Sequence, residues 1–187
     1  MKNIVIVVSL SIMFGGCTLF SAKQFPEGSS QVVNFNDPET CNSTKVMPTF
    51  SGEHSEVWEE RVLSSAKTVT EILQTQSFSQ ACQALRMTRT NDKSVQEVCR
   101  EMVCAGEIIP SISFYHDPST RAIAYESNGA LLINTAKESA GAGGPGNIAH
   151  EVTHTLGYTH FTNWAFLGKS SVPYRIGNLV QKLSNEN

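Results

Sequence analysis

The sequence predicts a small α+β domain, and three observations along its 187 residues support this. Apolar residues recur at helical spacing in the first half of the chain. Short segments typical of strands follow, and a histidine-rich helix and an amphipathic helix come last. The length suits one domain, and 40% hydrophobic residues suffice for one core. We expect N-terminal helices, a short mixed sheet and two C-terminal helices within residues 46–187.

Three N-terminal helices are expected, over about 52–74, 77–87 and 94–103. The first has one apolar stripe, which includes Trp58, and Ser51 can cap its start. The third opens with Ser94 and Glu97, which have the spacing of a capping box. Each helix is therefore expected to pack one face on a shared core.

The strand pattern lies between residues 106 and 134. One or two short strands are expected around 108–115, and two more, 122–125 and 130–134, joined by a tight turn. The last strand directly precedes the histidine-rich helix. It is expected either to accept an extended substrate along an exposed edge or to serve only as part of the sheet.

The glycine-rich segment 141–146 leads into the histidine-rich helix. No Lys-Ser/Thr pair follows it, which excludes a P-loop. We interpret the glycines as allowing this loop to pass close to the site, or as forming a mobile rim around it.

Residues 150–160 have the sequence HEVTHTLGYTH and hold three of the five histidines. On a helix His150 and His154 lie one turn apart, and Gly157 can end the helix so that the chain returns His160. Three imidazoles with one open position are typical of catalytic rather than structural zinc. The full pattern arises by chance in about one such chain in 10^5, so a helix that merely carries histidines is the weaker interpretation.

This pattern resembles that of the metzincin zinc metallopeptidases. The resemblance implies a zincin-like fold, with His150, His154 and His160 as Zn²⁺ ligands and Glu151 as the general base. It also implies a peptide or protein substrate, attacked by a water molecule that the metal activates.

The chain departs from that family where a turn methionine is expected beneath the metal. The last methionine is Met102, so none follows His160. The segment Ser171-Val172-Pro173-Tyr174 is similar to the missing turn, with proline near the place of methionine. By that similarity Tyr174 is expected to approach the metal and to act in catalysis.

The N-terminus has the features of a secretory signal. Lys2 precedes an apolar run over residues 4–14, and Gly15-Gly16-Cys17 follows. The small pair before Cys17 resembles the cleavage site of bacterial lipoproteins. This implies a signal peptide over 1–16, a lipid anchor on Cys17 and a tether over 17–45. An ordinary signal peptide that leaves Cys17 unmodified is the alternative.

Thr18, rather than aspartate, follows Cys17, which resembles the rule for lipoproteins of the outer membrane. In a bacterium with two membranes, this implies an anchored protein facing the periplasm or the cell surface. The mature chain would carry 13 basic and 17 acidic residues, a net charge of −4. No basic patch stands out, so nucleic acid is not an expected partner.

Four cysteines remain after Cys17, an even number for an oxidising compartment. They allow three pairings. If helices 77–87 and 94–103 form an antiparallel hairpin, Cys82 and Cys99 lie at one level. That favours Cys82–Cys99, which leaves Cys41–Cys104.

After His160 an aromatic patch either lines a specificity pocket or fills a small core; it comprises Phe161, Trp164, Phe166 and Leu167. An amphipathic helix from about Val172 is expected to close the chain. His54 and His116 have no partner pattern and are expected at the surface. The favoured function is a lipid-anchored zinc endopeptidase. The alternatives are an envelope lipoprotein that binds zinc without turnover and a structural envelope protein without metal.

Overall fold

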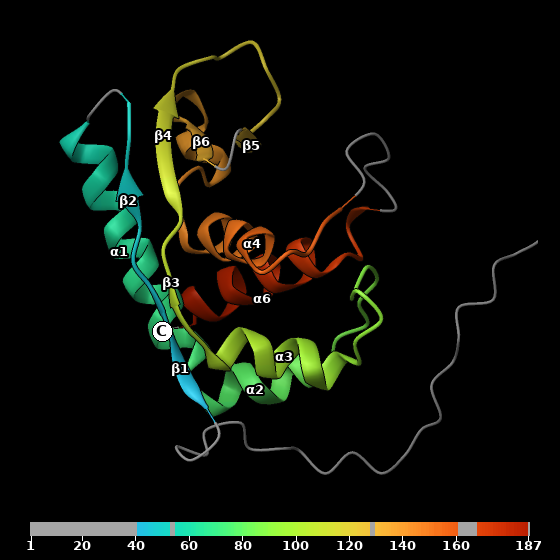
Figure 1. The fold of residues 1–187 in the computed structure, drawn as a ribbon. Helices are drawn as coiled ribbons and strands as arrows, with labels where there is room; N and C mark the ends of the chain where they lie inside the picture. Colours follow the sequence, from blue (N-terminus) through green and yellow to red (C-terminus); the bar gives the residue numbers. More distant parts are fainter. Residues whose placement is uncertain (1–40, 53–54, 128–129, 161–167, 187) are drawn as a thin grey trace, which may run out of the picture. The chain divides into compact units, whose positions relative to one another are not determined.

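The computed structural model describes residues 41–52, 55–127, 130–160 and 168–186 (Figure 1). It is an α+β fold, as the sequence predicts. Signal segment 1–16, Cys17 and most of the tether lie outside the described residues. So do His54 and the aromatic patch at 161–167.

Two small sheets form the β part of the fold. The first pairs β1 (Asn42–Val46) in parallel with β3 (Ala105–Ile108). The second has the order β2-β4-β6-β5, with bounds Thr49–Phe50, Ser111–Tyr115, Ala130–Asn134 and Ala124–Ser127. Strands β2, β4 and β6 run parallel, and β5 pairs antiparallel with β6. The expected mixed sheet is therefore present.

Strand β6, which precedes the histidine-rich helix, is not at the edge of its sheet. It pairs with β4 on one side and with β5 on the other, so its backbone groups are already used. The expectation that this strand itself accepts a substrate strand is wrong. Within the described part of the chain, β5 is the edge strand on that side.

The folded domain begins earlier than expected. Four of the five residues of strand β1, 42–45, lie inside the segment 17–45 that the sequence analysis assigned to the tether. The Thr44 side chain is buried and accepts a hydrogen bond from the Ala105 backbone. The strand was not predicted because its residues are mostly polar. Only Thr44 and Val46 face the core, and the other three residues are exposed.

Five α-helices and one short 3-10 helix, η1 (Thr135–Ala140), complete the described fold. The α-helices are α1 (Glu56–Leu73), α2 (Gln76–Gln83), α3 (Val95–Cys104), α4 (Pro145–Thr155) and α6 (Val172–Ser184). The capping box of α3 is confirmed, with Ser94 and Glu97 each bonding the backbone of the other. Ser51 does not cap α1. Its N–H donates to the Ile112 carbonyl in the sheet, and α1 starts after Ser55.

Both expected disulfides are confirmed, Cys82–Cys99 between α2 and α3 and Cys41–Cys104 beside β1. Helix α2 ends at Gln83 rather than near Met87. The reason lies in Thr88, whose backbone pairs with that of Ser171 just before α6. That pairing needs extended backbone, which a longer helix would exclude.

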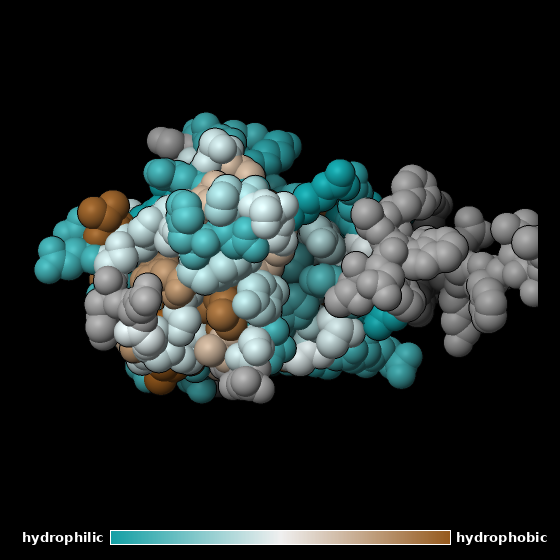
Figure 2. Space-filling view, turned by 90° about the horizontal axis from the view of Figure 1, so that it is seen from above, coloured by the Kyte–Doolittle hydropathy of each residue, from teal (hydrophilic) through white to brown (hydrophobic). Residues whose placement is uncertain are grey.

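One core joins α1, α3, α4, α6 and the inner face of the larger sheet. The half-buried ring of Trp58 lies 6.3 Å from that of Phe114, so Trp58 is part of this packing. Figure 2 shows separate hydrophobic residues among hydrophilic and neutral ones on the face that it presents. Among the described helices, none is long and apolar enough to cross a membrane.

Candidate metal centre

Helix α4 carries two histidines whose rings lie close together on one face of the helix. Gly144 precedes the helix, and Pro145 in its first turn favours the helical start. His150 and His154 are one turn apart, and their ring centroids lie 5.0 Å from each other. The expected placement of these two histidines on one helical face is therefore confirmed.

Gly157 ends this helix and reverses the chain. It has φ +86°, the left-handed conformation that glycine adopts without strain. The Gly157 N–H donates to the His154 carbonyl, and the Tyr158 N–H donates to the Thr153 carbonyl. This pair of bonds is a Schellman motif. It directs the following residues back toward the helix, as the spacing of the motif predicts.

The third histidine completes a nearly equilateral triangle. The ring centroid of His160 lies 5.1 Å from that of His150 and 5.0 Å from that of His154. Candidate ligand nitrogens of the three rings all lie within 4.8 Å of one another. Because imidazole suits transition metals better than Ca²⁺ or Mg²⁺, this donor set fits zinc or a similar ion.

The protonation of two rings also suits metal binding. The Nδ1 atom of His154 lies 2.7 Å from the Tyr158 carbonyl oxygen, which only accepts, so Nδ1 carries the proton. That leaves Nε2 with a lone pair for a metal. Burial, followed by the neighbouring His154 and His160, lowers the pKa of His150 to about 3. His150 is therefore neutral at ordinary pH, the form that can bind a metal.

Glu151 lies beside the triangle in a small cleft. The cleft has a volume of about 190 Å³, and Glu126 of β5 and Leu131 of β6 line it together with Glu151, His154 and Thr155 of α4. Glu151 is 8% exposed. Burial, and then the charge of Glu126, raise the pKa of Glu151 to about 8 in the metal-free site. A cation at the histidines would favour the carboxylate and lower this pKa.

Tyr174 lies beside two of the three histidines. Its ring centroid is 4.7 Å from that of His150 and 4.9 Å from that of His160. Tyr174 is 37% exposed, so part of the residue remains accessible. Helix α6 can bring Tyr174 this close because Gly146 and Gly177 let α4 and α6 approach each other.

Comparison of the chain with protein-family models, curated proteins and solved structures gives no match. What this centre can do therefore has to be argued from its own residues.

Sequence reasoning missed the residues that support the three histidines without belonging to the triangle. The buried Tyr158 hydroxyl donates to Glu101 of α3, which also binds Lys93. Burial, and then the bond to Glu101, raise the pKa of Tyr158 above its ordinary value. Tyr158 lies at a position of the motif where any residue type is allowed. The motif therefore did not predict the contact of Tyr158 with Glu101.

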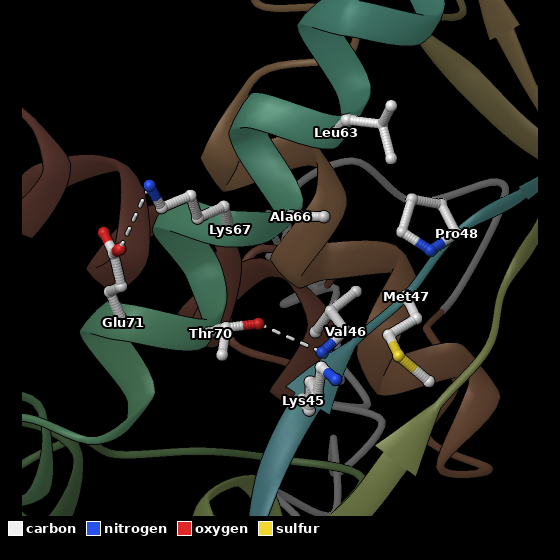
Figure 3. Close-up of a pocket in the computed structure, with 9 residues that line it drawn as sticks. All are labelled: Lys45, Val46, Met47, Pro48, Leu63, Ala66, Lys67, Thr70 and Glu71. Carbon is white, nitrogen blue, oxygen red and sulfur yellow. Dashed lines mark hydrogen bonds and ion pairs between the residues drawn. The ribbon is translucent and has the colours of Figure 1, made fainter.

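A larger hollow, of about 340 Å³, lies between α1 and β1 (Figure 3). Its lining is mostly apolar, and its Lys67 and Glu71 form an ion pair with each other. None of the residues that line it belongs to the histidine cluster. The smaller cleft beside Glu151 is therefore the better candidate for chemistry.

Proposed function

We propose that this protein is an exported, lipid-anchored zinc endopeptidase with a metzincin-like site. The observation that carries the proposal is the triangle formed by His150, His154 and His160, with Glu151 in the adjoining cleft. Three imidazoles leave a fourth position open for water or substrate. A buried carboxylate next to that position has the place and the chemistry of a general base.

Zinc, Glu151 and Tyr174 each have a separate role in peptide hydrolysis. When bound, zinc supplies a Lewis acid and lowers the pKa of a water molecule. Glu151 accepts one proton of the attacking water and passes it to the leaving nitrogen. The C–N bond breaks as the C–O bond forms, and the second proton of the water stays with the products, a carboxylate and an ammonium group. The Tyr174 hydroxyl donates a hydrogen bond to the substrate oxygen as negative charge develops on it.

The substrate is an extended peptide that adds to the outer edge of β5, the edge strand of the described sheet. In support, β5 contributes Glu126 to the same cleft as Glu151, so the edge and the general base adjoin one hollow. An added strand uses its backbone groups for affinity, and alternate side chains meet the cleft. A folded protein without an extended segment would be cleaved poorly.

The place of the protein is the bacterial cell envelope, with a lipid on Cys17 and the outer membrane as the favoured site. This rests on the N-terminal sequence. The two disulfides support an oxidising compartment, because such bonds rarely persist in the cytosol.

Binding of zinc without turnover is the second candidate function. It is favoured by one observation, the absence of any methionine after His160. On this alternative the site would bind zinc but would not cleave peptides.

Metal dependence of cleavage tests the proposal. The mature protein would be incubated with a peptide library and a denatured protein, then treated with a chelator, and then resupplied with Zn²⁺. The proposal expects cleavage that is lost with the metal and restored by it, and a His154→Ala variant that binds no zinc. Zinc-loaded protein that cleaves no peptide would support the second candidate instead.

A further inference from the structure

We propose that Tyr158 is a positioning residue for the metal ligands and that the α2–α3 connection, residues 84–94, holds it and its neighbours in place. The inference rests on the proposed function only in that the three histidines bind zinc. It concerns a part of the chain, the α2–α3 hairpin, that contributes no ligand.

Tyr158 links a ligand to α3 through its two ends. Its carbonyl oxygen accepts the proton of His154 Nδ1, which fixes both the tautomer and the orientation of that ring. Its side chain is fully buried, and its hydroxyl donates to the Glu101 carboxylate over 2.5 Å. Movement of the tyrosine ring would therefore move the carbonyl that orients His154.

Lys93 reinforces this link from the start of α3. Its ammonium binds the same Glu101 oxygen and lies 5.2 Å from the centroid of the Tyr158 ring. A cation above an aromatic face is attracted to it, so Lys93 holds both the acceptor and the ring. The three side chains form one connected group beneath the reversal after α4.

The α2–α3 connection also holds the backbone of the reversal. Asn91 Nδ2 donates to the Gly157 carbonyl over 3.1 Å, and Arg89 donates to the Thr159 hydroxyl over 3.3 Å. Arg89 and Asn91 have φ of 58° and 54°, a conformation uncommon for residues other than glycine. Surrounding contacts have to sustain such a conformation, which indicates a connection of defined shape.

The same connection reaches the start of α6, which carries Tyr174. The Thr88 N–H donates to the Ser170 carbonyl over 2.8 Å, and the Val172 N–H donates to the Thr88 carbonyl over 3.2 Å. The connection thus contacts the chain just before His160 and again just before Tyr174. The Cys82–Cys99 disulfide ties the two helices on either side of it.

These contacts predict that the hairpin sets metal affinity. A ligand set held ready by surrounding hydrogen bonds binds its ion more tightly, and loss of such outer contacts typically weakens binding by about 10- to 100-fold. Tyr158→Phe removes the hydroxyl and keeps both the ring and the carbonyl. Because its effect on His154 is indirect, we expect the lower end, about a tenfold higher Kd for Zn²⁺.

The test measures the Kd for Zn²⁺ of the mature protein by competition with a chromophoric chelator. Tyr125→Phe on β5 is the matched control, and Glu101→Gln, which keeps an acceptor, should retain most of the affinity that Glu101→Leu loses. The visible spectrum of the Co²⁺-loaded protein is a second readout, since it reports ligand geometry and not stability. We expect a changed spectrum in Tyr158→Phe and none in Tyr125→Phe.

Wild-type affinity and spectrum in Tyr158→Phe, with only a lowered Tm, would overturn the inference. If Tyr158→Phe does not fold, Asn91→Ala decides the matter, because Asn91 is exposed and its truncation leaves the core intact. An unchanged Kd in that variant would equally refute the role. Failure of the wild type to bind zinc would instead refute the proposed function, so the two failures are distinguishable.

Discussion

Gly146 and Gly177 meet where α4 crosses α6, and a Cβ added to Gly177 would lie 2.7 Å from the Gly146 carbonyl oxygen. The same Cβ would lie 3.1 Å from the Cβ of His150. The two glycines therefore set the distance between the helix that carries His150 and His154 and the helix that carries Tyr174.

Gly177→Ala is expected to lower the free energy of unfolding by about 1–2 kcal/mol. Overpacking against backbone costs about 1–3 kcal/mol, and the better helix propensity of alanine offsets up to about 1 kcal/mol. Asn178→Ala, at an exposed position on the same helix, is the control and should not be destabilised. Chemical denaturation measures both variants, and equal stability would contradict the close crossing.

The two disulfides are expected to act differently on stability and on metal binding. Cys41–Cys104 spans 63 residues and Cys82–Cys99 spans 17. Loop-closure entropy predicts losses of about 4 and about 3 kcal/mol when each pair is replaced by serine.

Only the Cys82–Cys99 replacement should weaken Zn²⁺ binding, because that bond closes the α2–α3 hairpin. Denaturation curves and chelator competition on both double variants check this. An unchanged zinc affinity in both would argue against a role for the hairpin.

Tyr174→Phe is expected to reduce kcat and leave KM and zinc content nearly unchanged. Removal of one donor to a developing oxyanion typically lowers kcat by about 100-fold or more. Steady-state kinetics on a cleaved peptide, with zinc content determined on the same samples, measures the effect. An unchanged kcat would show that the Tyr174 hydroxyl has no catalytic role and that the residue only packs its ring against His150.

Glu126 is expected to favour a basic substrate side chain near the cleaved bond. It is the second carboxylate in the cleft with Glu151, so two acidic side chains line this hollow. Glu126→Gln should reduce the preference for Lys and Arg in a peptide library, and Glu126→Lys should turn it toward Asp and Glu. The same cleavage profile in all three proteins would show that Glu126 does not select.

Features that depend on nearby residues could be predicted from the sequence. The spacing of His150 and His154 and the glycine at 157 specify a ligand pair and a helix end by local geometry alone. The capping box of Ser94 and Glu97 is likewise local. Even the Cys82–Cys99 pair follows from one hairpin, because the two cysteines lie at equal distance from its turn.

Contacts between distant segments gave no such signal. The pairing of Thr88 with Ser171 joins residues far apart in the chain and leaves no periodic pattern in either segment. Ser51 is a suitable cap by composition, but its N–H bonds to the Ile112 carbonyl in the sheet, and α1 begins only after Ser55. The sequence pattern also does not show which of β5 and β6 lies at the edge of the sheet, because that depends on which distant strand each one pairs with.

Substitution of the general base tests the central claim most directly. Glu151→Ala removes the carboxylate and keeps all three histidines, so zinc content and cleavage can be measured on the same sample. The account predicts about one zinc ion per chain in both proteins and no detectable cleavage of a denatured protein by the variant. Cleavage by Glu151→Ala at the rate of the wild type would contradict it.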